Sequence, residues 1–324
     1  MPAKKPGNPI LDQLKSATTD ERLAVEFFER MRWPEGAACP RCGDVDVYQM
    51  MQAGTDERQE NFRWRCRGCK KQFTVRVGTI MEDSPIPLKV WAYAFWSACA
   101  SKKGVSSLQI QRETGLSYKS SLFMMHRIRW AMVESGGAPL FGTVEVDETY
   151  VGGKPRKANK VEDRKSAKRG RGTDKQPVVA MVERGGRVRT RVVANVTAAN
   201  LEEAMRECVH PSACIVTDEL NVYPSAARDF AGGHKTVKHG DGEYVKYEAD
   251  GFAIHTNTAE GFFSLFKRAL IGAYHHVSRE HLHRYAAERE FLYNTRKMDD
   301  ADRVATAIRM AEGKRLTYKQ PALA

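Results

Sequence analysis

Residues 141–153 read "FGTVEVDETYVGG", a run in which apolar and polar side chains alternate. This alternation predicts a β-strand, and Asp147 stands where its apolar text meets polar text. A second strand is predicted within "ACIVTDEL" at 213–220, which reaches Asp218 in the same way. Because neighbouring strands lie only about 4.8 Å apart, acidic residues at the ends of two adjacent strands can meet.

The text around these two strands predicts an α/β domain. Two further strands, "PVVAMVERG" at 177–185 and "RVRTRVVANV" at 187–196, are expected to meet at Gly185 and Gly186 in a hairpin. A helix is predicted at 197–209, another strand within 234–245, and mostly helix from 257 onward. Strands and helices that mix in this way indicate a central sheet, which we assign to residues 139–300.

The first 138 residues divide by composition into three segments. Residues 1–35 are predicted to be helical, because Thr18 and Glu21 have capping-box spacing at the start of an amphipathic run over 18–32. Residues 36–82 are rich in Cys, Gly and Arg and indicate a small domain. Residues 83–138 read as helices broken at Gly115, which predicts either a DNA-reading helix-turn-helix or a packed helical hairpin. A C-terminal helix and tail are expected at 301–324.

Two Cys-x-x-Cys pairs lie in the small domain, Cys39 with Cys42 and Cys66 with Cys69, with 23 residues between the pairs. Four thiolates supply the closed tetrahedral set that zinc prefers, and so small a domain needs such a staple, so we expect one Zn²⁺ per chain. A redox pair or an iron–sulfur site fits less well, since the motif is doubled and basic residues surround it. The other cysteines stand alone in apolar text, which predicts buried core thiols at Cys99, Cys208 and Cys214.

A third acidic candidate is Glu260 in "HTNTAEGFFSLFKR" at 255–268, where an amphipathic helix is predicted to begin. Three hard oxygen donors suit Mg²⁺ or Mn²⁺, and two such ions about 4 Å apart would serve phosphodiester chemistry. Structural roles compete with this interpretation. An aspartate at a strand end is often a turn former, and Asn257-x-x-Glu260 has capping-box spacing. Lys267, two helical turns beyond Glu260, is placed to contact a DNA phosphate.

Charge and composition restrict the class of protein. Lys plus Arg number 52 against 40 for Asp plus Glu, and the formal net charge of +12 favours a polyanionic partner. A basic loop at 154–176 predicts DNA contact, although such runs are also common as solvated loops. The longest apolar stretch, 90–100, is too short to span a bilayer, and no secretory signal is evident. We therefore expect an intracellular protein without a membrane partner and, since no phosphate-binding loop motif occurs, without a nucleotide cofactor.

Six blocks of sequence, in this order, carry a family resemblance: "CPRCG", "RWRCRGCKKQFTVRVGTIMEDSPIPLKVW", "VEVDETYVGGK", "IVTDELNVY", "HTNTAEGFFSLFKR" and "GAYHHVSREHLHRYAAEREFLYNTR". They fall between roughly residue 20 and residue 300. In these blocks the chain resembles the zinc-ribbon-bearing DDE transposases of bacterial insertion sequences, in the ISXO-two-like group of the family numbered fifteen-ninety-five.

This resemblance implies a ribonuclease-H-like catalytic domain, a mixed five-stranded sheet with helices, preceded by a zinc ribbon and a helical segment. Asp147, Asp218 and Glu260 would be the catalytic residues and would bind two Mg²⁺ or Mn²⁺ ions per active site. Glu148 and Glu219 stand beside the two aspartates as rival ligands. Strand alternation turns both away if the aspartates point into the site.

The implied activity is binding of the terminal inverted repeats of an insertion sequence, followed by strand cleavage and transfer into target DNA. The chain would act as a homo-oligomer, a dimer or larger, in the cytoplasm on the nucleoid. DNA contacts are predicted for basic residues of the ribbon, the basic loop and the helix after Glu260: Arg41, Arg67, Lys70, Lys154, Arg169, Arg171, Lys267 and Arg268. No metal is assigned to the histidines His255, His275, His276, His281 and His283.

Two other functions stay open at this level. A metal-dependent nuclease or junction resolvase shares the same fold and ions, and would cut DNA without joining it. A zinc-ribbon DNA-binding regulator would use the carboxylates only as caps and surface charges.

Overall fold

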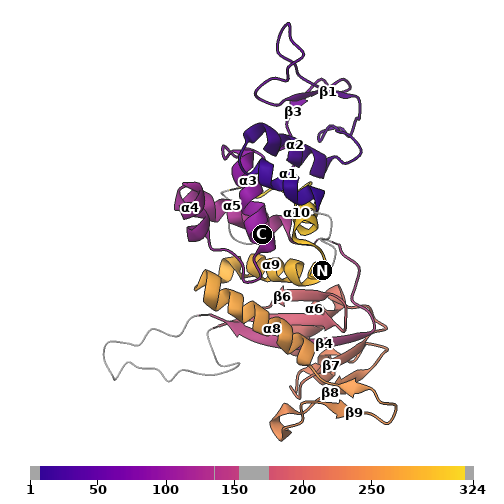
Figure 1. Ribbon diagram of the computed structural model, residues 1–324. Coiled ribbons are helices and arrows are strands. Elements are labelled where there is room, and N and C mark those ends of the chain that lie inside the picture. The colour runs from indigo at the N-terminus through magenta and orange to yellow at the C-terminus, as the bar shows by residue number, and fades with distance from the viewer. Residues whose placement is uncertain (1–7, 135, 153–174, 318–324) are drawn as a thin grey trace, which may run out of the picture. The chain divides into compact units, whose positions relative to one another are not determined.

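The computed structural model describes residues 8–134, 136–152 and 175–317. The chain forms two compact units (Figure 1). The first contains the described residues up to 134 and those from 295 onward, and the second contains those from 136 to 294. The sequence predicted separate N-terminal segments, whereas the structure packs these and the C-terminal helix into one unit.

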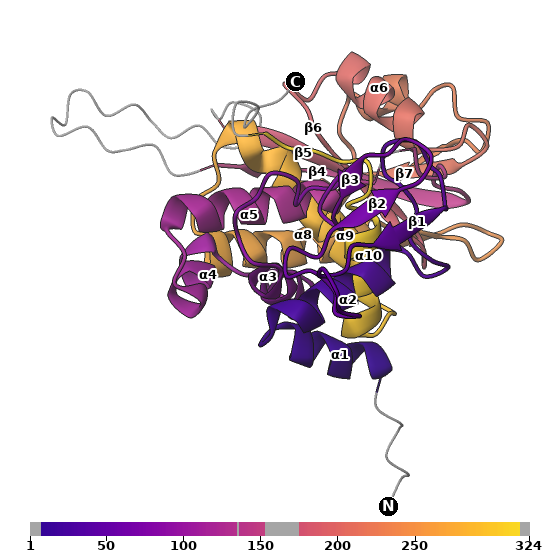
Figure 2. The same ribbon diagram turned by 90° about the horizontal axis from the view of Figure 1, so that it is seen from above.

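The second unit is built on a mixed five-stranded sheet in the order β6-β5-β4-β7-β8 (Figures 1 and 2). Its antiparallel part comprises β4 (Thr143–Val151), β5 (Gln176–Glu183) and β6 (Val188–Val192). Its parallel part adds β7 (Cys214–Thr217) and β8 (His234–Thr236) to the other side of β4. The predicted fold class, a zinc-ribbon region and helices followed by a mixed five-stranded sheet with helices, is confirmed.

Helices cover both faces of this sheet. On one face, α6 (Ala198–Cys208) and α7 (Tyr223–Ala226) pack against alternate strand residues such as Val144 and Val146. On the other face, α8 (Asn257–Ala269) and α9 (Leu282–Asn294) pack against Val178, Ala180 and Val182. Because side chains of a strand alternate between faces, β4 contributes Glu145, Asp147 and the residues that follow at spacing two to the α8 side.

Short elements connect the sheet to α8 and α9. They are η3 (His239–Asp241), β9 (Lys246–Tyr247), β10 (Ala253–Ile254), the π-helix η4 (Leu270–Tyr274) and η5 (Arg279–His281). Strand β4 also continues four residues past Asp147, where the sequence predicted that it would end. It does so because β5 pairs with it along its whole length up to Val151.

The first unit combines a small three-stranded antiparallel sheet with six helices among its described residues. The strands are β1 (Val47–Gln49), β2 (Trp64–Cys66) and β3 (Gln72–Phe73). The helices are α1 (Pro9–Ala17), α2 (Glu21–Arg32), α3 (Leu88–Ala100), α4 (Ser107–Thr114), α5 (Tyr118–Ala131) and α10 (Asp300–Arg309). No part of the described chain forms a helix with the length and apolar character that a bilayer crossing requires.

Local side chains decide where these helices begin. Asp20, rather than the predicted Thr18, caps α2 by accepting a hydrogen bond from the Leu23 amide at 2.9 Å. α4 ends at Gly115, whose positive φ of 72° suits glycine, and α5 starts three residues later, directly after the Ser117 cap. The structure thus has two helices joined by a tight turn at the predicted place. Its use in reading DNA stays a prediction.

Candidate metal centre and acidic site

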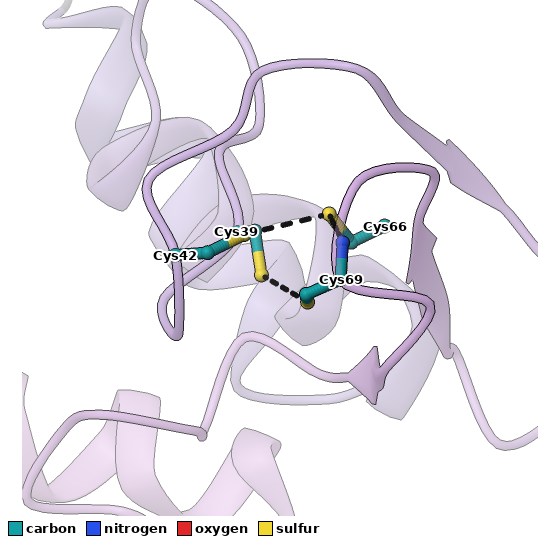
Figure 3. Close-up of side chains that lie close together, drawn as sticks. All are labelled: Cys39, Cys42, Cys66 and Cys69. Atoms are coloured by element: carbon teal, nitrogen blue, oxygen red, sulfur yellow. Dashed lines mark hydrogen bonds between the residues drawn. The ribbon is translucent and has the colours of Figure 1, made fainter.

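The four cysteines of the two Cys-x-x-Cys pairs converge in the first unit (Figure 3). Their Sγ atoms all lie within 4.8 Å of one another, and the Cys39–Cys69 and Cys42–Cys66 pairs are each 3.7 Å apart. Four sulfurs in a tetrahedron about zinc, at the usual Zn–S distance of about 2.3 Å, are separated by about 3.8 Å. The cluster therefore fits a zinc ion.

Tight backbone turns hold each cysteine pair. The residue after the first pair, Gly43, has φ of 78°, and the residue after the second pair, Lys70, has φ of 58°. A positive φ is costly for lysine, about 1 kcal/mol or more, so the surroundings must enforce it. Around the cysteines pack the rings of Trp33, Trp64 and Phe73 and little else that is apolar. So small a core needs support beyond apolar packing, which a metal bound by the four thiolates would supply.

The remaining cysteines lie apart from this centre. Cys99 and Cys208 are buried, as predicted, whereas Cys214 is only partly buried. Burial raises the pKa of the Cys208 thiol to about 11, which suits an unreactive thiol.

In the second unit, the parallel pairing of β4 with β7 brings Asp147 and Asp218 together. Thr143, Val144 and Glu145 pair with Cys214, Ile215 and Val216 in register. Continued by two residues, this register sets Asp147 level with Asp218 on the neighbouring strand, which is about 4.8 Å away. β7 ends at Thr217, so Asp218 stands at the carboxyl end of its strand while β4 runs on.

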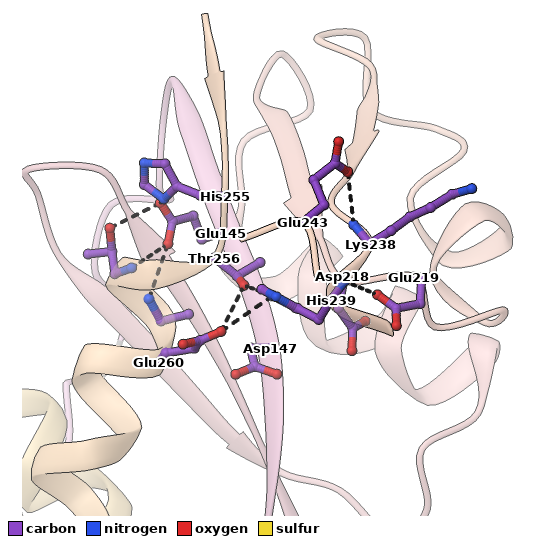
Figure 4. A network of polar contacts seen from close by, with 12 residues as sticks. Glu145, Asp147, Asp218, Glu219, Lys238, His239, Glu243, His255, Thr256 and Glu260 are labelled. Atoms are coloured by element: carbon purple, nitrogen blue, oxygen red, sulfur yellow. Dashed lines mark hydrogen bonds and ion pairs between the residues drawn. The ribbon is translucent and has the colours of Figure 1, made fainter. Parts of the chain in front are cut away.

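Glu260 faces the two aspartates from helix α8 (Figure 4). It lies in the first turn of α8, and its side chain is 50% exposed. Asp147 points to the α8 side of β4, so Figure 4 shows its carboxylate between those of Glu260 and Asp218. The three predicted acidic residues therefore lie near one another, with Asp147 in the middle.

The pKa of Asp147 reflects the nearby carboxylates. Burial raises its pKa to about 7, and the negative charges of Glu148, Asp218 and Glu260 add to the effect. Among the described residues, only the four cysteines form a group of three or more metal-ligating atoms within 4.8 Å of one another, so the three carboxylates are spaced more widely. Facing carboxylates that repel one another in this way offer hard oxygen ligands to a divalent cation.

The rival carboxylates have other partners. Glu148 accepts a hydrogen bond from the buried Tyr223 hydroxyl at 2.6 Å, on the α6 side of the sheet. Glu219 accepts hydrogen bonds from the backbone amides of His239 and Gly240 at 2.7 and 2.8 Å, which lower its pKa. The carboxylates of Glu148 and Glu219 therefore stabilise local structure through these hydrogen bonds.

Glu145 is a functional residue that sequence reasoning missed. It is fully buried, and its carboxylate accepts hydrogen bonds from the backbone amides of Thr258 and Ala259 at 2.8 and 3.1 Å. It also accepts one from the Arg184 guanidinium at 2.7 Å. A strand residue thus caps the N-terminus of α8, the role that capping-box spacing had offered to Glu260. Since Glu145 precedes Asp147 by two residues on the same face, strand β4 positions both Asp147 and the anchor of helix α8.

We expect Glu145→Gln to lower the free energy of unfolding of the second unit by about 2 to 4 kcal/mol, because it leaves Arg184 without its buried counter-charge. Urea unfolding followed by circular dichroism measures this. The matched control is Glu207→Gln, which removes an exposed partner of Arg191 and should cost less than about 1 kcal/mol. Equal costs for the two substitutions would contradict the anchoring role.

His239 is a second residue that the sequence did not point to. Its Nε2 lies 3.4 Å from a Glu260 carboxylate oxygen and 3.0 Å from the Thr256 hydroxyl (Figure 4). The Thr256 hydroxyl in turn lies 3.4 Å from Glu260. No local pattern could have indicated these contacts, because His239 comes from the short helix η3 after β8.

The predicted DNA-contact residues fall into three groups. Arg41, Arg67 and Lys70 are exposed beside the cysteine cluster, and Arg67 is 3.3 Å from Asp46. Lys267 and Arg268 are exposed on α8. The others lie outside the described residues: Lys154, Arg169 and Arg171. Of the histidines, His255 lies 3.2 Å from Glu145, and none joins a metal-ligand group in the described chain.

Comparison with known proteins gives two family matches and one relative. Residues 19–72 match the sequence model of a transposase zinc-ribbon domain, and residues 139–294 match that of an ISXO2-like transposase domain. An uncharacterized protein in the transposable element ISH50 of Halobacterium salinarum is 30% identical over 277 residues, which cover 82% of this chain and 88% of the relative. No solved structure matches the chain.

Proposed function

We propose that this chain, which belongs to the family of ISXO2-like transposases with a zinc ribbon, cuts and joins DNA strands at the site formed by Asp147, Asp218 and Glu260. The observation that carries the proposal is the parallel register of β4 and β7, which sets the two aspartates level beneath the glutamate of α8. The family membership supports a nucleic-acid-cleaving enzyme, and the carboxylates supply the chemistry it requires.

The donor set fits Mg²⁺ or Mn²⁺, since it consists of carboxylate oxygens whose mutual repulsion a cation relieves. One or two such ions held by Asp147, Asp218 and Glu260 would stabilise the negative charge that develops on the attacked phosphodiester. The chain itself orients these ligands: Glu145 fixes the start of α8, and His239 with Thr256 holds one oxygen of Glu260.

The reaction that we propose has two steps of the same type. Water attacks a phosphodiester at the element end, which leaves a 3′-hydroxyl on one strand and a 5′-phosphate on the other fragment. That 3′-hydroxyl then attacks a phosphodiester of target DNA, and the displaced strand leaves with its own 3′-hydroxyl. One phosphodiester replaces another in the second step, so no nucleotide is consumed.

The zinc-ribbon and transposase domains together suggest DNA binding, and we propose that the ribbon contributes to holding the element ends. Arg41, Arg67 and Lys70 give it an exposed cationic surface next to the cysteine cluster. Lys267 and Arg268 on α8 would contact phosphates beside the carboxylates. We further propose that two or more copies act together on paired ends.

The test is a strand-transfer assay with the full chain. Labelled duplexes that carry the DNA flanking its coding region are mixed with a plasmid and Mg²⁺ or Mn²⁺. We expect cut 3′ ends and labelled plasmid, both lost on addition of EDTA. Inverted repeats at the flanks would define the substrate. Cutting without joining would instead favour a nuclease or resolvase, and binding without cutting would favour a regulator.

A further inference from the structure

A groove of about 450 Å³ lies beside the acidic site, between the end of β4 and the bend that follows α8. Its floor is apolar, because Val151, Leu270 and Val277 pack against the core under α8. Its rim carries the cationic side chains of Lys175 and Lys267 together with the imidazole of His276. Among the described residues that line it, none is acidic. An apolar floor with a cationic rim suits a ligand that has a flat ring and a negative charge.

The groove continues directly from the acidic site along both of its walls. On α8, Lys267 lies seven residues beyond Glu260, about 10 Å at 1.5 Å per residue. On β4, Val151 lies four residues beyond Asp147, about 13 Å at 3.3 Å per residue. A DNA strand covers such distances in about three to four nucleotides at the duplex rise of about 3.4 Å, and in fewer when extended.

The lip of the groove has an unusual backbone. α8 passes into the π-helix η4, a rare form that is frequent at functional sites. His275 follows with φ of 58° and ψ of −47°, and the His276 amide donates a hydrogen bond to the Tyr274 carbonyl at 2.6 Å. This is the strained γ-turn with positive φ at its centre. Backbone strain of this kind clusters at ligand-binding and active sites, and here it places the exposed His275 and His276 at the rim.

An exposed apolar side chain lies in the π-helix that precedes this strained turn. Ile271, within η4, lines the groove and leaves 74% of its surface accessible. An aliphatic side chain in that position offers a contact face for a base that has left the duplex stack.

We propose that this groove holds one unpaired nucleotide of the DNA strand being processed, with its base on the apolar floor beside Ile271 and its phosphate against Lys175, Lys267 and His276. The inference rests on the proposed function for the identity of the ligand as DNA. It assigns to the β4–η4 groove the unstacking of a base within about four nucleotides of the attacked phosphodiester.

The test uses 2-aminopurine, a base whose fluorescence rises when it leaves the stack. It is placed at one position at a time in duplexes that carry the DNA flanking the coding region, with the full chain in EDTA so that no strand is cut. We expect a several-fold rise confined to one or two positions near the cleavage point. Ile271→Glu and His276→Glu should abolish the rise and weaken binding roughly tenfold, since stacking and phosphate contacts of one nucleotide are lost.

Each variant has a matched control. Leu265→Glu replaces an exposed apolar residue, in α8, that does not line the groove. Arg228→Glu reverses an exposed cation that follows α7, on the opposite face of the sheet. Both controls should keep the fluorescence rise.

Two results would overturn the groove assignment: no position brightens although the duplex is bound, or the rise survives both groove variants. Either could occur in a protein that still cuts and joins DNA, which would leave the proposed function standing. A localised rise in fluorescence in a protein that never cuts DNA would support the groove assignment and contradict the proposed function.

Discussion

Asp147→Asn should abolish strand cutting and joining, with a loss of at least about 10³-fold, while the protein still folds and still binds DNA. The expectation follows from position. Asp147 lies between Asp218 and Glu260, so it is the carboxylate that a cation shared by all three must contact (Figure 4). An amide of the same shape keeps the packing and removes the negative charge that the cation requires. Single-turnover assays of a labelled duplex measure the loss.

The pH dependence of stability in the same variant tests the electrostatics of Asp147 without an assay of DNA cutting. In metal-free protein the pKa of Asp147, raised to about 7, exceeds the usual unfolded value of about 4. The folded state therefore favours the protonated form, and the stability from this group is full below about pH 4 and lost as pH rises through about 7. Asp147→Asn should flatten that pH dependence. In EDTA at pH 8 it should raise the melting temperature by a few degrees.

The control is Glu148→Gln, which alters the adjacent carboxylate on the other face of β4. It should reduce activity far less, because Glu148 is held by the Tyr223 hydroxyl. If Glu148→Gln were the inactive variant and Asp147→Asn the active one, the assignment of the metal ligands would be reversed. An Asp147→Asn protein that joins DNA at the normal rate would remove this residue from the site altogether.

Cys66→Ser should remove zinc and unfold the ribbon. Cys66 is fully buried in a core that holds only a few large side chains, so without the metal little remains to fix residues 36–82. Structural zinc contributes on the order of 10 kcal/mol to the folding of such small domains. Elemental analysis should fall from about one zinc per chain to none.

Tryptophan fluorescence gives an independent reading of the same event. The rings of Trp33 and Trp64 pack edge to face, with centroids 6.0 Å apart beside the cysteines. Their emission should shift to the red in Cys66→Ser and on chelation of the wild type. Cys214→Ser, in β7 of the other unit, should keep both zinc and the native emission. A zinc-loaded Cys66→Ser protein with native emission would contradict the four-cysteine centre.

Local patterns predicted much of this architecture. Alternation over 141–153 indicated β4, Gly185 and Gly186 marked the β5–β6 hairpin, and the spacing of the cysteine pairs indicated their cluster. Each of these features is determined by the types and spacing of residues that are close together in the sequence. The misplaced cap of α2 is the instructive exception, since both Thr18 and Asp20 can cap and only the actual chain path decides between them.

What the sequence could not provide are contacts between distant segments. Glu145 lies 113 residues from Thr258, and no periodicity connects a buried strand glutamate with a helix start so far along the chain. His239 near Glu260 is a similar case. Local patterns offered Asp147, Asp218 and Glu260 as candidates, and the resemblance joined them into one predicted site. The alignment of the two aspartates follows from the β4–β7 register, which single-strand patterns do not contain.

Because Glu145 and Asp147 must stay two residues apart, β4 should tolerate insertions and deletions far less well than an exposed turn does. One residue added between them would turn Asp147 toward α6, so protein engineers should treat β4 as fixed in length. The turn that joins β9 to β10, around Gly251, faces solvent and carries no such constraint. A tag or a reporter domain inserted there should leave the enzyme working.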